Sequence, residues 1–139
     1  MAGFSTPTYT KGDSSALMPG ILDLWPYCGD DFEQVLHFRH INSEGEVTGP
    51  IDLTKYNEKK AEIRTIGTKQ LVVTFGLLLP DGDIGGNVIL YLPWQDTVKL
   101  GLYPELEWDL SFTFNSYQHT GAKVTVLAGK VYPKKEVTE

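Results

Sequence analysis

The sequence predicts an all-β protein whose strands form a β-sandwich or barrel. The first observation is a period of two in hydrophobicity, clearest at 105–115, where apolar and polar side chains alternate. The second is the regular return of Gly, Asp, Asn and Ser clusters between about seven short apolar runs. Short strands with frequent turns favour two sheets packed face to face, because a single sheet would leave its apolar face in water.

The strands are expected in order along the chain, each ending at a turn signal. Their expected ranges are 21–25, 32–41, 58–66, 69–77, 86–92, 105–115 and 123–132. The turn clusters are 29–31 (GDD), 42–46 (NSEGE), 80–86 (PDGDIGG) and 115–121 (NSYQHTG). One helical turn is expected near 94–100, where Pro93 favours a helix start and Gly101 a stop. Such a turn is a common connection between two sheets.

Alternation along each strand predicts which side chains face the core. The expected inward residues are Phe32, Leu36, Phe38, Ala61, Ile63, Leu71, Val73, Phe75, Val88, Leu90, Leu92, Trp108, Leu110, Phe112, Phe114, Val124, Val126 and Ala128. Charged side chains occupy the opposite face at Lys60, Glu62, Arg64, Glu107 and Asp109. These rows are interpreted as the solvent-facing side of antiparallel sheets and not as a reactive surface.

Composition excludes several classes of protein. The chain has 139 residues, enough for one domain with a core of its own, and 18 acidic against 12 basic residues, whereas nucleic-acid binding requires a basic surface. Its one cysteine cannot form an internal disulfide. No signal peptide or membrane-spanning run is present in the sequence. These features predict synthesis in the cytoplasm and no membrane or nucleic-acid partner.

The first 20 residues are expected to form an extended N-terminal arm in front of a β-sandwich domain at 21–139. The arm is rich in Gly, Ser, Thr and Pro and shows no strand or helix period. Its isolated apolar residues are Phe4, Tyr9, Leu17 and Met18. Two alternatives remain open: an arm that becomes ordered on a partner through these residues, or a terminus without fixed structure.

Candidate metal ligands are found in the loop that begins at Asp81. Asp81, Asp83 and Gly86 take the first, third and sixth places of a calcium-binding loop. The twelfth place, however, is Leu92, where a glutamate is needed, and no helices flank the loop. A tight turn that uses glycines at positive φ is the preferred interpretation.

No catalytic constellation is predicted. Asp30, Asp31 and Glu33 cluster after Gly29, but no second set of ligands accompanies them, and a turn entering a strand accounts for the pattern. Cys28 has no cationic residue next to it in sequence that would activate the thiol. The sequence therefore predicts a non-enzymatic protein without a cofactor or metal.

Aromatic residues are more numerous than a small core requires. Trp25, Trp94 and Tyr117 are candidates for exposed positions, where they would anchor a protein partner or stack on sugar rings. A glycan-binding module used in host attachment is therefore one alternative, provided that these rings lie together.

The order of several segments resembles the small immunoglobulin-like sandwich domain of bacteriophage tail and baseplate proteins, as found at the N-terminus of baseplate upper proteins. The matching segments are GDDFEQVLHF, GPIDLTKYNEKKAEIR, GNVILYLPWQDTVKLGLYPELEWDLSF and VTVLAGKVYPKKEVT, within 21–138. The matching positions are Gly29, Asp30, Asp52 to Thr54, Arg64, Thr97, Tyr103, Trp108 to Leu110, Gly129, Val131, Val137 and Thr138.

The resemblance implies an immunoglobulin-like antiparallel sandwich and a role in virion structure. The expected function is an adaptor in a tail, baseplate or fibre attachment site, present in several copies and bound to other virion proteins. Capsid decoration or a neck position is an alternative. This chain departs from the family because the sandwich is preceded by an arm and ends at Glu139, whereas family members often continue into a helical or fibrous extension.

Overall fold

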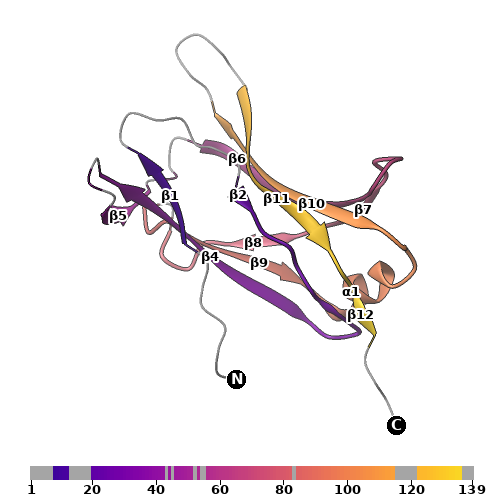
Figure 1. Ribbon diagram of the computed structural model, residues 1–139. Helices are drawn as coiled ribbons and strands as arrows, with labels where there is room; N and C mark the ends of the chain where they lie inside the picture. Colours follow the sequence, from indigo (N-terminus) through magenta and orange to yellow (C-terminus); the bar gives the residue numbers. More distant parts are fainter. Residues whose placement is uncertain are drawn as a thin grey trace.

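The computed structural model describes residues 8–12, 20–42, 44, 46–51, 53, 56–82, 84–114 and 122–135. At 8–12, 41, 48, 56, 57, 114 and 122 it describes the backbone only. These residues form two facing sheets, with one short helix at one end (Figure 1). The predicted all-β sandwich is confirmed.

Each of the two sheets contains five strands among the described residues. The first has the order β1-β4-β9-β8, with β5 also paired to β4, and its bounds are β1 (Thr8–Gly12), β4 (Phe32–Ile41), β5 (Val47–Pro50), β8 (Gly76–Leu78) and β9 (Asn87–Leu92). The second has the order β2-β11-β10-β6-β7, with β2 (Gly20–Ile21), β6 (Tyr56–Thr65), β7 (Leu71–Thr74), β10 (Leu106–Phe114) and β11 (Ala122–Val131). Two short strands, β3 (Tyr27–Cys28) and β12 (Lys134–Lys135), pair with each other.

Three strand pairs are parallel, so the expectation of a purely antiparallel sandwich is wrong at the sheet margins. β1 runs parallel to β4, β2 to β11 and β3 to β12. In each pair the added strand is short and lies close to the N-terminus. The expected strands begin at residue 21, whereas Thr8–Gly12, within the expected extended arm, also forms a strand. Backbone pairing with β4 orders this segment without requiring a hydrophobic period.

One expected strand, 69–77, is divided between the sheets. β7 pairs with β6 in the second sheet and β8 pairs with β9 in the first, while Phe75 lies between them with its N–H bonded to Ala61 O at 2.9 Å. The strand therefore changes sheets at Phe75. The helix α1 (Trp94–Leu100) makes the predicted crossover, from β9 in the first sheet to β10 in the second.

Two of the expected inward residues face outward because β-bulges shift the alternation. Leu71 lies opposite Arg64 after a register shift and is 46% exposed. In β11, Leu127 pairs with Leu110 while Thr125 pairs with Ser111, so Val126 is an extra residue and Ala128 lies on the outer face. One inserted residue reverses every side chain that follows it, and the sequence pattern does not reveal the insertion.

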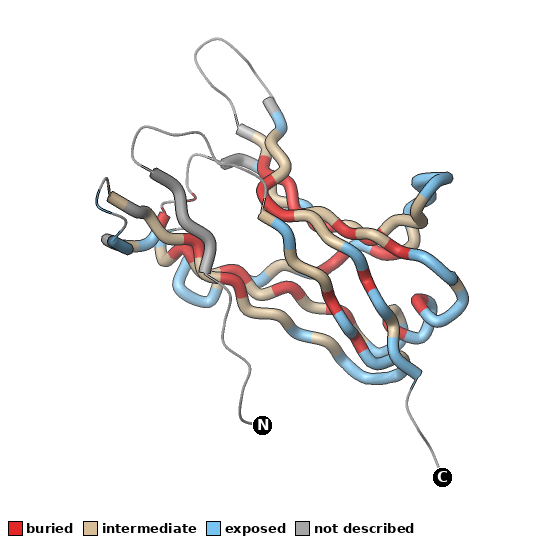
Figure 2. The backbone as a smooth tube through the Cα atoms, viewed as in Figure 1, coloured by how far each residue is buried: buried red, intermediate tan, exposed pale blue. Residues whose placement is uncertain are grey.

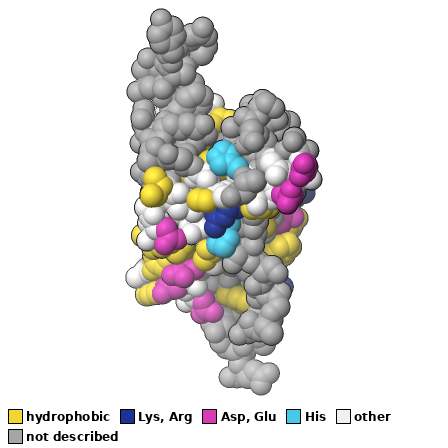
Figure 3. Space-filling view, turned by 90° about the vertical axis from the view of Figure 1, so that its left-hand side faces the viewer, with side chains coloured by type: hydrophobic (Ala, Val, Ile, Leu, Met, Phe, Trp, Pro, Cys, Tyr) yellow, Lys and Arg dark blue, Asp and Glu magenta, His cyan; other side chains and the backbone are white. Residues whose placement is uncertain are grey.

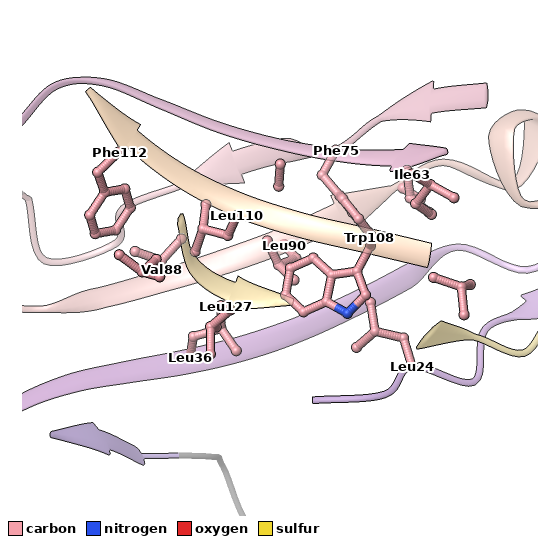
Figure 4. Close-up of a cluster of buried hydrophobic side chains, with 14 of the residues drawn as sticks. Leu24, Leu36, Ile63, Phe75, Val88, Leu90, Trp108, Leu110, Phe112 and Leu127 are labelled. Carbon is pink, nitrogen blue, oxygen red and sulfur yellow. The ribbon is translucent and has the colours of Figure 1, made fainter. Parts of the chain in front are cut away.

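Most of the remaining inward predictions are confirmed by burial between the sheets (Figures 2 and 4). The buried residues are Leu36, Phe38, Ala61, Ile63, Val73, Phe75, Val88, Leu90, Leu92, Trp108, Leu110, Phe112 and Val126, whereas Phe32 and Val124 pack partly buried against them. The Phe114 side chain lies outside the described residues. Aromatic rings link the two sheets, since Phe38 packs on Phe112 at 5.7 Å and Phe75 on Trp108 at 5.8 Å between ring centroids.

Candidate functional site

Exposed aromatic side chains gather at the margin of the second sheet, where residues 20–28 run alongside β11 and β12. Trp25 stacks on Tyr132, with ring centroids 5.5 Å apart and an interplanar angle of 23°. The exposed fractions of these two residues are 51% and 42%, and Tyr27 is exposed as well. Stacked rings that remain in water form a platform suited to a partner or a ligand.

The sequence-predicted site residues are only partly brought together. Trp25 belongs to the exposed platform, but among the described residues its ring partner is Tyr132 and not Trp94. Trp94 is 52% exposed at the start of α1. Phe4, Leu17, Met18 and Tyr117 lie outside the described residues, as does the side chain of Tyr9, whose backbone belongs to β1.

The segment at 20–28 is joined to β11 by an irregular ladder of hydrogen bonds. The Leu22 carbonyl turns inward and accepts a hydrogen bond from Trp108 Nε1 at 2.7 Å. The neighbouring N–H of Lys130 then donates to Asp23 Oδ1 at 2.9 Å, so a side chain takes the place of the displaced carbonyl. Regular pairing resumes at Leu24, whose N–H donates to Lys130 O at 2.9 Å.

Gly129 permits this inward turn. A Cβ atom at Gly129 would lie 1.9 Å from Leu22 O, a distance at which no side chain fits. Gly129 and Trp108 together join the segment around Leu22 to the core.

The outer face of the second sheet is hollowed into a shallow pocket of about 570 Å³. Its lining is Ile21, Asp23, Glu62, Arg64, Glu107, Trp108, Asp109, Thr125, Ala128, Gly129, Lys130 and Tyr132. Four carboxylates therefore face two cations, Arg64 and Lys130, and acidic character dominates. The small side chain of Ala128 leaves space on this face that a larger residue would fill.

Two ion pairs involve the charged rows of this face. Arg64 binds Glu62 at 2.8 Å, and Lys69 binds Glu107. Asp109 lies between Glu62 and Ala128 on the neighbouring strands and makes no hydrogen bond or ion pair to the described residues. Burial raises the pKa of Asp109, Glu62 and Glu107 raise it further, and Lys123 and Arg64 lower it.

The turn at Asp30 and Asp31 is hydrogen-bonded to α1 through one carboxylate and one backbone carbonyl. Asp31 Oδ1 accepts the N–H of Trp94 at 2.8 Å, and Thr97 Oγ1 donates to Asp30 O at 2.8 Å. Thr97 Oγ1 also accepts the N–H of Gly29 at 3.0 Å. The predicted turn at 29–31 is therefore fastened to the helix.

The opposite end of the first sheet holds the loop that begins at Asp81, whose spacing partly matches a calcium site. Asn87 Nδ2 donates to Asp81, and Arg39 Nη2 donates to Asn87 Oδ1 at 3.0 Å. Gly82 and Gly86 have φ of +70° and +67°, as the turn interpretation predicted. Asp83 lies outside the described residues. Figure 3 views this side of the molecule, where histidine and basic side chains lie together between acidic and hydrophobic ones.

Among the described residues, no group of three or more His, Cys, Asp or Glu side chains is arranged to hold a metal ion. The same residues contain no helix with the length and hydrophobicity of a membrane span. No family model matches the sequence, and a search of curated proteins finds no match.

Proposed function

We propose that this chain is a structural protein of a bacteriophage virion, an adaptor of the tail, baseplate or fibre attachment site that binds other virion proteins and catalyses no reaction. The observation that carries the proposal is the exposed apolar margin of the second sheet. Ile21 is 85% exposed there, four residues before Trp25, which stacks on Tyr132. Apolar side chains concentrated on an open sheet margin are typical of a protein-binding surface.

The motif residues support the same class of function. Gly29, Thr97, Trp108 and Gly129 all make contacts that hold the sandwich together, so the resemblance is one of architecture. A sandwich with an exposed apolar margin suits a protein that connects larger components of a particle. Repetition in a symmetric particle makes weak individual contacts sufficient, because linked copies raise the effective concentration.

The test is to locate the chain in purified particles from the organism that encodes it. Mass spectrometry of those particles should detect this chain, and cryo-electron microscopy should place it in several copies at a tail position. Density on the capsid would instead indicate a decoration protein, and density at the neck would indicate a neck protein. Either result would overturn the tail position. Absence from the particles would overturn the virion proposal.

A glycan-binding attachment module is the second candidate, and the stacked pair of Trp25 and Tyr132 beside a polar pocket is the observation that favours it. Binding on a glycan array that is lost in Trp25→Ala and kept in Trp94→Ala would support this function. The two variants are matched, because both remove a half-exposed tryptophan. No binding across a broad array would exclude it.

A further inference from the structure

Within the part of the chain that the structure describes, one side of the strand segment from Ile21 to Trp25 is unpaired. Leu22 N–H and Leu24 N–H donate to carbonyls of β11, and Leu24 O accepts the N–H of Tyr132 at 2.8 Å. The even-numbered residues thus use the inner side of the segment. The N–H and C=O groups of Ile21, Asp23 and Trp25 point the other way, and the described residues offer them no hydrogen-bond partner.

The side chains of the same three residues form a short chemical pattern on the outer face. Ile21 and Trp25 are exposed apolar residues, and Asp23 lies between them. One Asp23 oxygen accepts the Lys130 N–H, which fixes the carboxylate in place without neutralising its charge. The acidic pocket continues from Asp23 across the sheet.

We propose that this edge accepts an extended segment of another protein as an added antiparallel strand, with a Lys or Arg opposite Asp23 and apolar residues opposite Ile21 and Trp25. Alternating donors and acceptors at every second residue are complementary to an extended backbone. The charge of the partner residue follows from Asp23 and the carboxylates behind it, because an opposite charge directly across a pair of strands is stabilising.

This inference deepens the proposed function by giving the chemistry of the partner. Its test uses a defined probe, the heptapeptide acetyl-Thr-Val-Thr-Arg-Thr-Val-Thr-amide, titrated into the purified full chain and followed by the amide signals of an NMR spectrum. In the proposed register its Arg lies opposite Asp23 and its Val residues lie opposite Ile21 and Trp25. Shifts should concentrate at 20–25 and 128–132, and shifts confined to other regions would overturn the assignment.

Methylation of the peptide backbone separates strand addition from contact through side chains alone. In the proposed pairing the N–H of the central Arg points at Asp23, whereas the N–H groups of its two Thr neighbours point away. N-methylation of the Arg should abolish binding, and N-methylation of a neighbouring Thr should leave it within about twofold. Any other pattern overturns the pairing.

The charge is tested on both partners. A Glu in place of the central Arg of the peptide should weaken binding about tenfold. Asp23→Asn keeps an oxygen for the Lys130 N–H and removes the charge, so it should weaken binding of the Arg peptide about threefold. Glu33→Gln on the other sheet is the matched control and should leave binding unchanged. Equal affinity of the two peptides, or of Asp23→Asn and the unmodified chain, would contradict a basic partner residue.

The test also separates this inference from the virion proposal. A chain that is found in particles but does not bind the peptide keeps the proposed function and loses the inference. A chain that binds the peptide but is absent from particles keeps the inference and loses the proposed virion function. Self-association through the same amides, with no response to the peptide, would assign the edge to a second copy and overturn the partner proposed here.

Discussion

Gly129 shows how one residue can determine a contact between distant parts of the chain. Leu22 O occupies the space where its side chain would be, and this carbonyl accepts the Trp108 hydrogen bond. Gly129→Ala should therefore displace Leu22 and break that bond, lowering the free energy of unfolding by about 1–3 kcal/mol. Chemical denaturation measures the loss.

Gly49→Ala provides the control for this prediction. A Cβ atom at Gly49 would have no atom within 4 Å, and Gly49, like Gly129, lies in a strand. We expect its unfolding free energy to stay within about 0.5 kcal/mol of the unmodified chain. If the two variants lose equal stability, the close approach of Leu22 to Gly129 is not what limits the side chain there.

The raised pKa of Asp109 predicts how the free energy of unfolding depends on pH. Burial raises the pKa of Asp109 above its ordinary value of 3.8, with Glu62 and Arg64 facing it from β6, Lys123 from β11 and Glu107 from its own strand. The folded chain then holds this proton more tightly than the unfolded chain. The resulting stability is fully present below the ordinary value and is lost as pH rises through the folded-state pKa.

Asp109→Asn removes this charge at every pH. Relative to the unmodified chain, the variant should gain up to about 0.5 kcal/mol at about pH 7 and lose that advantage at about pH 3. Urea denaturation at both pH values measures the difference. A variant that is less stable at neutral pH would show that the carboxylate makes a favourable interaction in the folded chain.

Residue patterns predicted the platform only in part. Trp25 was found from its type, but Tyr132 was not, because their contact joins positions far apart in the sequence through a parallel edge pair. The hydrogen bond from Lys130 to Asp23 has the same origin and spans 107 residues. Such contacts depend on the pairing of strand segments, and neither composition nor period encodes that pairing.

At the scale of elements, long strands were more predictable than short ones. The range expected at 32–41 coincides with β4, because ten residues carry enough alternation to define a strand. β3 and β12, with two residues each, contain no period and exist through their mutual pairing. The bulges at Val72 and Val126 produced the two wrong inward assignments, Leu71 and Ala128.

The helix α1 depends on one buried hydroxyl. Thr97 is fully buried and bonds through Oγ1 to both Asp30 O and the N–H of Gly29, which links the helix to the turn before β4. Thr97→Val conserves the shape but leaves these groups without their partner, and should cost about 1–3 kcal/mol. Thr97→Ser keeps the hydroxyl and should cost less. Thermal unfolding of the two variants measures the order, and a reversed order would indicate that the methyl group matters more than the hydrogen bonds.

At the scale of the whole molecule, we expect the core to fold without the N-terminal segment. The buried hydrophobic side chains of the described residues begin at Leu24 and fill the space between the sheets. β1 pairs through its backbone with β4 at the margin of the first sheet. Removal of residues 1–12 should therefore leave a folded chain.

The deletion should have a different effect on association. Without β1, the backbone groups of β4 between His37 and Ile41 that face it lose their parallel partner and become an open edge. We expect the shortened chain to retain one cooperative unfolding transition and its near-UV circular dichroism, and to self-associate more strongly in analytical ultracentrifugation than the full chain. Loss of the cooperative transition would place the N-terminal segment within the core. A folded chain that stays monomeric at every concentration would show that an unpaired β4 edge alone does not cause association. It would follow that a protein-binding sheet margin in this fold also needs exposed apolar side chains such as Ile21 and Trp25.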